Sequence, residues 1–365
     1  MSTGQIFFVV GIVGMLATAT LLTMALAGNV QAAEIRSVGP DGEAAVDAST
    51  IELTDDQIAQ IKEGGYTAAI CLHYGGNDWS TSQQKGLEDT FGELGIEIVA
   101  VTDANFSAET QVSNIETVMA KKPDILVSIP TDATATADAY KQAAAAGIKI
   151  VFMDQRADGL EAGKDYVSVV SADNYGNGYA SGTVLGDALG GKGKVAMVYY
   201  DANFAPTNQR DEGFRDAMKN YPDIEIVTEQ GFTDESGCAE QGDAILTQFP
   251  NIDGIYASWD VPMEGVLSAV RAAGMEGKVT LACNDLGNNV AREIASGNIA
   301  GGGAQMPYDQ GVAEAKLAAL ALLGEETPSY VAVPAETVTH ENVLEAYTDV
   351  YHVETPDWLK EAYVE

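Results

Sequence analysis

Residues 194–222, KVAMVYYDANFAPTNQRDEGFRDAMKNYP, contain the pattern that decides the fold of this chain. The apolar run KVAMVYY is typical of a strand that is buried on both faces. The segment after it places Phe214 and Met218 one helical turn apart, which predicts a helix with one apolar side. A buried strand followed by such a helix is the repeating unit of a parallel α/β sheet.

The same alternation of strand and helix extends from Tyr66 to a long helix that ends near Gly324. The runs that predict strands are TAAICLHY, EIVAV, DILVSIP, KIVFMD and YVSVVSADN, then KVAMVYY, EIVTEQG, GIYASWD, VTLACND and IAGGGAQ. These strands are too many for one comfortable core, and a chain of 365 residues is natural for two domains. We therefore expect the α/β class, with two doubly wound parallel-sheet lobes. The acidic tail after Gly324 is expected to be irregular.

Residues 1–32 form an apolar N-terminal segment. The run from Ile6 to Ala27 is long enough to cross a bilayer, which needs about 20 residues, and small residues suited to signal-peptide cleavage lie at Ala27 and Ala32. No Lys or Arg precedes the run, and it exceeds the usual length of a signal-peptide core. We expect a signal peptide or N-terminal anchor over 1–32, export of the rest, and a linker and first helix over 33–65.

The charge of the chain excludes one class of partner. It has 54 acidic and 19 basic side chains, for a formal net charge of −35. Such a field repels phosphate backbones, so we expect no nucleic-acid binding. The acids are scattered along the sequence, which favours a role in solubility.

Motifs that carry catalytic chemistry are missing from the sequence. There is no HExxH, GxSxG or Walker pattern, and the three His residues have no metal-ligand spacing. The three cysteines, Cys71, Cys238 and Cys283, form neither a metal spacing nor a CxxC pair. We expect no catalytic residue, no metal site and no cofactor, and whether the cysteines pair is left open.

Polar and aromatic side chains follow several of the predicted strands. Ligands in open α/β sheets bind beyond the carboxyl ends of the strands, where Trp rings can stack on a sugar and Asp, Asn and Gln can bond its hydroxyls. The alternatives are helix capping by a strand-end Asp and ordinary packing by Trp. The candidate ligand-binding residues are Asn77, Trp79, Asp154, Gln155, Asn208, Trp259, Asp260, Asn284, Asp285 and Gln305.

Ordered landmarks between residues 66 and 325 carry a family likeness. They are Asn77-Asp78-Trp79, Lys85-Gly86, Pro130-Thr131-Asp132, Phe152-Met153-Asp154, Ser171–Asn174, Arg210–Phe214, Trp259-Asp260, Asn284-Asp285 and Ala304–Pro307. In this order and spacing the chain resembles the periplasmic sugar-binding proteins of ABC transporters, the type I class typified by ribose-binding protein.

The resemblance implies two lobes joined by three crossovers, near Ser171–Asn174, Gln305–Pro307 and Pro334–Thr337. Lobe 1 would comprise residues 66–171 and 306–334, and lobe 2 residues 172–305 and 335–365, including a C-terminal tail. It further implies a monomeric periplasmic receptor that closes on a ligand by a hinge and delivers it to the membrane permease of an ABC transporter.

The resemblance also bears on the ligand. Asn77, Trp79, Asp154, Asp285 and Gln305 coincide with family positions that hold the sugar. Departures from the ribose pattern suggest a monosaccharide or polyol of a different shape. Where ribose-binding proteins have Phe, Asn, Asn and Arg, this chain has Trp79, Trp259, Ile129 and Asn208, respectively.

Three other functions fit parts of the sequence. Two Trp among several Asp could form an aromatic and acidic cage for a cationic solute. A sugar-responsive regulator shares the fold but requires a basic helix-turn-helix, where this chain has an apolar segment. A carbohydrate-active enzyme could use Asp154, Asp260 or Asp285 as acid and base, although all three are more simply hydroxyl acceptors.

Overall fold

The computed structural model describes Met1 and residues 34–364. Apart from Met1, the predicted signal peptide or anchor over residues 1–32 lies outside the described residues. Ala33–Glu365 form one compact unit. In the part of the chain that the structure describes, no helix is long and apolar enough to cross a membrane.

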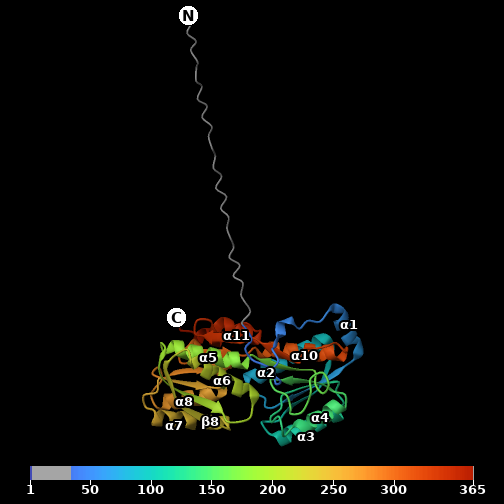
Figure 1. Ribbon diagram of the computed structural model, residues 1–365, viewed down its shortest axis with the longest axis horizontal. Coiled ribbons are helices and arrows are strands. Elements are labelled where there is room, and N and C mark those ends of the chain that lie inside the picture. Colours follow the sequence, from blue (N-terminus) through green and yellow to red (C-terminus); the bar gives the residue numbers. More distant parts are fainter. Residues whose placement is uncertain (2–33, 365) are drawn as a thin grey trace. The chain divides into compact units, whose positions relative to one another are not determined.

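The first lobe is built on a seven-stranded parallel sheet. In spatial order its strands are β1 (Val46–Asp47), β12 (Tyr330–Val333), β6 (Ser168–Ala172), β5 (Lys149–Met153), β4 (Ile125–Ser128), β2 (Thr67–Leu72) and β3 (Glu97–Asp103). Helices cover both faces (Figure 1): α1 (Asp55–Gly64), α2 (Asp78–Leu94) and α10 (Pro307–Leu322) on one, α3 (Ala108–Ala120) and α4 (Ala137–Ala145) on the other. Burial on both faces explains the apolar runs of the central strands β2, β4 and β5.

The second lobe is built on a six-stranded sheet. Its strands are β13 (Glu336–Thr339), β11 (Gly301–Ala304), β10 (Thr280–Cys283), β9 (Gly254–Ala257), β7 (Lys192–Tyr200) and β8 (Asp223–Phe232), and only β13 is antiparallel to its neighbour. One face is covered by α5 (Asn174–Ala188) and α6 (Ala205–Met218). The other is covered by α7 (Cys238–Gln248), α8 (Asp260–Ala272), α9 (Asn288–Ala295), α11 (Val343–Tyr351) and α12 (Asp357–Ala362). Phe214 and Met218 pack into the core beneath α6, as their spacing predicts.

The chain passes between the sheets three times: from β6 into α5, from β11 into α10 and from β12 into β13. These passages lie within the three segments that the family resemblance implied. The predicted fold class is therefore confirmed.

The segment expected to be a linker is ordered against both lobes. Val46–Asp47 forms β1 and pairs with β12. The backbone N–H groups of Arg36 and Ser37 donate to the carboxylate of Asp173 at 2.9 and 2.8 Å. These bonds satisfy the polar backbone of a segment whose composition alone is typical of a loop.

The tail after Gly324 is also more regular than expected, and that prediction was wrong. It contains β12, β13, α11 and α12. Val343, Tyr347 and Val350 repeat at helical spacing and pack into the second lobe. The acidic residues between them hide this periodicity when composition alone is considered.

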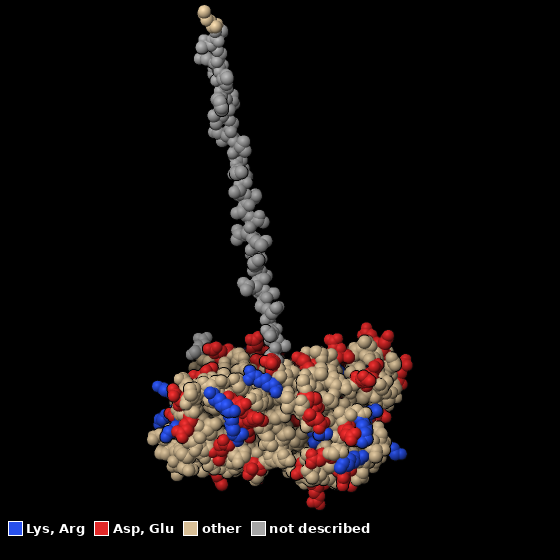
Figure 2. All heavy atoms as spheres, viewed as in Figure 1, with Lys and Arg blue, Asp and Glu red and all other residues tan. Residues whose placement is uncertain are grey.

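The acidic side chains are dispersed over the surface. Figure 2 shows Asp and Glu spread across the visible face, with Lys and Arg among them. Pairs such as Lys85–Asp89 are exposed and contribute little to stability. The pair of Arg210 and Asp285 differs because both side chains are buried, with 6% and 9% of their surface exposed.

Candidate functional site

A cleft with about 490 Å³ of empty space, part of it open to solvent, lies at the carboxyl ends of strands from both sheets. A cleft at this edge of an α/β sheet is where such folds bind small ligands. The residues that line it are His73, Tyr74, Asn77, Trp79, Phe106, Ile129, Asp154, Tyr200, Phe204, Pro206, Thr207, Arg210, Trp259, Asp260, Asp285 and Gln305. Most of the predicted ligand residues are in this set.

Three predicted residues do not line the cleft. Gln155 joins the lobes instead: its Nε2 donates to the carbonyl of Pro130 at 2.8 Å, and its Oε1 accepts from the N–H of Ala205 at 3.0 Å. Asn284 is fully buried and bonds Ser181, Tyr256 and Ser258 inside the second lobe. Asn208 lies on the exposed side of α6.

Asp154 and Asp285 share an unusual backbone. Their φ angles are 53° and 70°, in the left-handed region that Asp tolerates better than most residues. Asp154 follows β5, and Asp285 lies two residues beyond β10. Strain of this kind gathers at ligand-binding sites, and here it belongs to the two carboxylates at the ends of their strands.

The Asp154 carboxylate is held on one side only. Its Oδ1 accepts from Ser171 Oγ at 3.0 Å, the N–H of Ala172 at 3.3 Å and Gln310 Nε2 at 3.3 Å. Among the described residues, all its hydrogen bonds are made through Oδ1, which leaves Oδ2 available to a ligand. Burial raises the pKa of Asp154, and the charge of Arg210 opposes that shift.

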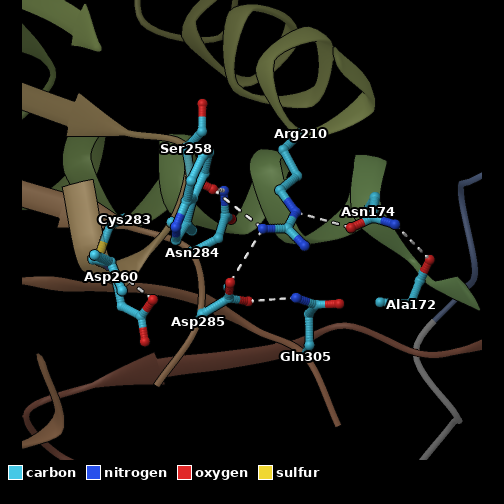
Figure 3. Close-up of polar contacts among 12 residues, drawn as sticks. Ala172, Asn174, Arg210, Ser258, Asp260, Cys283, Asn284, Asp285 and Gln305 are labelled. Carbon is cyan, nitrogen blue, oxygen red and sulfur yellow. Dashed lines mark hydrogen bonds and ion pairs between the residues drawn. The ribbon is translucent and has the colours of Figure 1, made fainter. Parts of the chain in front are cut away.

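Arg210 is a cleft residue that the sequence analysis missed as a ligand candidate. Its guanidinium lies between Asn174 and Asp285 (Figure 3), with Nε donating to Asn174 Oδ1 at 2.8 Å and Nη1 donating to Asp285 Oδ2 at 3.1 Å. A signal was present, because Arg210 precedes Phe214 by four residues and so shares the buried face of α6. The resemblance instead directed attention to Asn208, on the opposite face.

Gln305 completes this polar side of the cleft. Its Nε2 donates to Asp285 Oδ1 at 2.8 Å, so Asp285 is bonded through both oxygens. Gln305 Oε1 is buried without a partner among the described residues. A ligand hydroxyl could donate to it.

Asp260 lies close to Asp285 and is also deeply buried. Its oxygens accept from the N–H groups of Val261 at 2.8 Å and Gly287 at 3.0 Å. Burial, and then the charge of Asp285, raise its pKa well above the ordinary value for Asp. The two carboxylates therefore share one negative environment that Arg210 only partly offsets.

Aromatic rings from both lobes line the rest of the cleft. In the first lobe His73 lies within 5.7 Å of Trp79, centroid to centroid, and Tyr74 stacks on Phe106 at 4.2 Å. In the second, Tyr200 meets Trp259 edge-on at 5.6 Å. Burial lowers the pKa of His73 to about 3, so its ring is neutral.

The two lobes also contact each other directly at the cleft rim. Asp78, at the start of α2, accepts from the backbone N–H and side-chain Nδ2 of Asn288 at 2.7 and 2.8 Å. Glu235 accepts from Trp259 Nε1 at 2.8 Å and from the Tyr74 hydroxyl of the other lobe at 3.4 Å. Asn77 lines the cleft and also caps α2, by accepting from the N–H of Ser80 at 2.7 Å.

Residues 34–364 contain no group of three or more His, Cys, Asp and Glu side chains arranged to hold a metal ion. Cys71, Cys238 and Cys283 are all buried and free. The question of their pairing, open at the level of sequence, is answered by the structure.

Known proteins share this architecture. A family model described as a periplasmic binding protein domain matches residues 68–326. The D-ribose/D-allose-binding protein of Pseudomonas aeruginosa is 29% identical over 273 residues, 72% of this chain and 83% of that protein. The ribose import binding protein of Salmonella typhimurium is 24% identical over 272 residues, 74% of this chain and 90% of that protein.

Solved structures give the same result. An ABC transporter periplasmic solute-binding protein from Actinobacillus succinogenes with bound D-allose has a TM-score of 0.71 and 28% identity, covering 77% of this chain and 99% of that one. A solute-binding protein from Agrobacterium vitis bound with α-D-tagatopyranose has a TM-score of 0.73 and 25% identity, covering 80% of this chain and all of that one, 100%.

Proposed function

The chain belongs to the periplasmic binding protein domain family, and from that premise we propose that it is an exported receptor for a monosaccharide or polyol. The receptor acts as a monomer in the periplasm, captures its ligand between the lobes and delivers it to the permease of an ABC transporter. The observation that carries the proposal is the cleft in which Arg210, Asp285 and Gln305 form one hydrogen-bonded group, and which Trp79 and Trp259 also line.

A sugar has hydroxyl groups around its rim and apolar C–H faces, and the cleft offers a complement to both. Asp154 Oδ2 and Gln305 Oε1 accept hydroxyl protons, and Arg210 donates. Hydrogen bonds to charged groups contribute about 1.5–3 kcal/mol each. Trp79 and Trp259 provide the flat surfaces on which a ring packs.

We propose that Asn77, Trp79, Asp154, Arg210, Trp259, Asp260, Asp285 and Gln305 contact the ligand. The carboxylates act as hydroxyl acceptors and carry out no acid–base chemistry. The relatives favour a sugar over a cationic ligand, because the D-ribose/D-allose-binding protein and the solute-binding protein with bound D-allose are both described with neutral sugars.

Closure moves the two lobes as bodies, which we propose to be residues 66–171 with 306–334 and residues 172–305 with 335–365. Ligand contacts from both bodies favour the closed state, because a ligand shifts an equilibrium by its difference in affinity for the two forms. Asp154 and Trp79 belong to the first body, and Arg210, Trp259 and Asp285 to the second.

A thermal-shift screen of the full chain against pentoses, hexoses, deoxyhexoses and polyols tests the proposal. A ligand at 100 times its Kd stabilises the folded state by about 2.7 kcal/mol. Asp285→Asn should weaken the affinity about 10- to 150-fold through loss of a charged hydrogen-bond acceptor, and Trp259→Ala should also weaken it. Trp358→Ala is the matched control, because Trp358 packs in α12 against the core of the second lobe. Absence of stabilisation by every sugar and polyol would refute the receptor.

A further inference from the structure

A fully buried polar cluster lies between α2 and α10, next to Asp154. It consists of Gln83 on α2 and of Gln310 and Glu314, one turn apart on α10, and all three are 0% exposed. The two helices approach closely because they meet at glycines: a Cβ on Gly311 would lie 2.2 Å from the carbonyl oxygen of Gln83. None of the three side chains is therefore in contact with bulk solvent.

The hydrogen bonds of this cluster do not balance when Glu314 is ionised. Gln83 Nε2 donates to Glu314 Oε1 at 2.6 Å, and Gln310 Nε2 donates to Asp154 Oδ1 at 3.3 Å. Three acceptor oxygens, Gln83 Oε1, Gln310 Oε1 and Glu314 Oε2, find no donor among the described residues. An ionised carboxylate only accepts, whereas a protonated one carries an O–H donor. A proton on Glu314 Oε2 supplies a donor where the acceptors are in excess.

The electrostatic surroundings favour that proton. Burial raises the pKa of Glu314 well above its ordinary value, the negative charge of Asp154 raises it further, and the hydrogen bond from Gln83 opposes the shift. The strands β4 and β6, which lie beneath α10, carry no ionisable side chain. Other ionisable groups on elements packed against α10 do not face Glu314. Lys62, Lys85 and Lys149 are exposed, and Asp89 pairs with Lys85. Tyr330 packs in the core on the α3 and α4 side of the sheet, and the Tyr351 hydroxyl donates to the carbonyl of Leu286.

We propose that Glu314 is a positioning residue for the ligand site: it holds a proton on Oε2 and donates it in a hydrogen bond to Gln310 Oε1. That bond fixes the Gln310 amide with its Nε2 toward Asp154. Asp154 Oδ1 is then occupied from within the protein, and Oδ2 is left to accept a ligand hydroxyl. The role in sugar binding rests on the proposed function, whereas the protonation and the fixed amide do not.

Ionisation of Glu314 would reverse this arrangement. A carboxylate at position 314 has no donor for Gln310 Oε1 and attracts the amide N–H groups, so the amide turns and presents oxygen to Asp154. Two oxygens then oppose each other, and a second negative charge lies near Asp154. Ligand affinity should therefore fall as the pH rises through the raised pKa of Glu314.

Two measurements on the full chain need no ligand. In the infrared difference spectrum of wild type minus Glu314→Gln at neutral pH, we expect the carbonyl band of a protonated carboxylic acid. The second measurement is NMR of protein with ¹⁵N-labelled Gln side chains. The NH₂ signals of Gln310, assigned by their loss in Gln310→Met, should be protected from hydrogen exchange with solvent. They should persist in Glu314→Gln, whose amide donates to the same oxygen, and lose protection in Glu314→Met. A missing infrared band, or identical Gln310 signals in all three proteins, overturns the proposal.

The third measurement is calorimetric titration with D-allose and D-ribose as first probes, extended to the sugar that stabilises most in the screen. Glu314→Gln should bind like wild type at neutral pH and lose the alkaline decline, whereas Glu314→Met should bind about three- to tenfold more weakly, as expected for one lost neutral hydrogen bond. Equal affinity of all three proteins at every pH refutes the positioning role. If no sugar binds any of them, the receptor function fails, and the spectra alone decide the state of Glu314.

Discussion

Replacement of Arg210 by methionine should strongly destabilise the second lobe. Arg210 and Asp285 are 6% and 9% exposed and lie 3.1 Å apart, so solvent screens their attraction little. Removing one partner of a buried pair costs about 3–5 kcal/mol, because the other charge stays buried and uncompensated. Methionine keeps much of the volume, which limits the contribution of a cavity.

Arg215→Met provides a matched control on the same helix. Arg215 pairs with Glu229 at 2.6 Å, but both side chains are 38% exposed, and such pairs contribute about 0–1 kcal/mol. The free energy of unfolding from urea titration of each variant gives the comparison. Adding Asp285→Asn to Arg210→Met should recover part of the loss, since the double variant leaves one buried charge fewer. Equal losses for Arg210→Met and Arg215→Met would refute the reasoning.

Three further predictions concern the frame around the cleft. Gly86→Ala should lower the free energy of unfolding by about 1–3 kcal/mol, since its Cβ would lie 2.2 Å from a carbonyl oxygen of α10. Gly92→Ala is the control on the same helix. Its Cβ would meet no atom within 4 Å, so a melting experiment should show unchanged or higher stability. Burial raises the pKa of Asp211 from 3.8 to about 7, so its folded form keeps a proton that the unfolded chain releases. Stability should therefore fall as the pH rises from about 4 to 7, by up to about 4 kcal/mol, and a urea series should show a flatter profile for Asp211→Asn. Asp78→Ala removes the interlobe bonds to α9 and should speed sugar release in stopped-flow measurements by up to about tenfold. Asp89→Ala, also on α2, loses only bonds within the first lobe, to Lys85 and Tyr308, and should leave the release rate unchanged.

The sequence was informative where one local pattern carried the signal. Strand-length apolar runs and helical spacing predicted the α/β layers, because strands buried on both faces are mostly apolar. Asp154, Asp285 and Trp259 each follow a predicted strand, and all three line the cleft. Their position was predictable because the carboxyl ends of parallel strands meet at one edge of a sheet.

The local pattern failed where a residue's role depends on what it meets across the lobes. Gln155 follows Asp154 directly but bonds Pro130 and Ala205, so it joins the lobes and does not line the cleft. Asn208 and Arg210 are two positions apart on α6, and the helical turn carries only Arg210 to the inner face. Phe106 and Tyr200 come from segments far apart in the chain and meet only in the fold.

By itself the sequence determined the two-lobed α/β architecture and the chemical character of the cleft, because periodicity and strand-end position are properties of single segments. Only the tertiary structure decided which polar atoms are already bonded and which remain free. Asp154 Oδ2 is available because Gln310 and Ser171 bond the other oxygen, and Gln310 comes from a helix more than a hundred residues away in the chain. Hydrogen bonds form between neighbours in space, and separation along the chain does not reveal those neighbours.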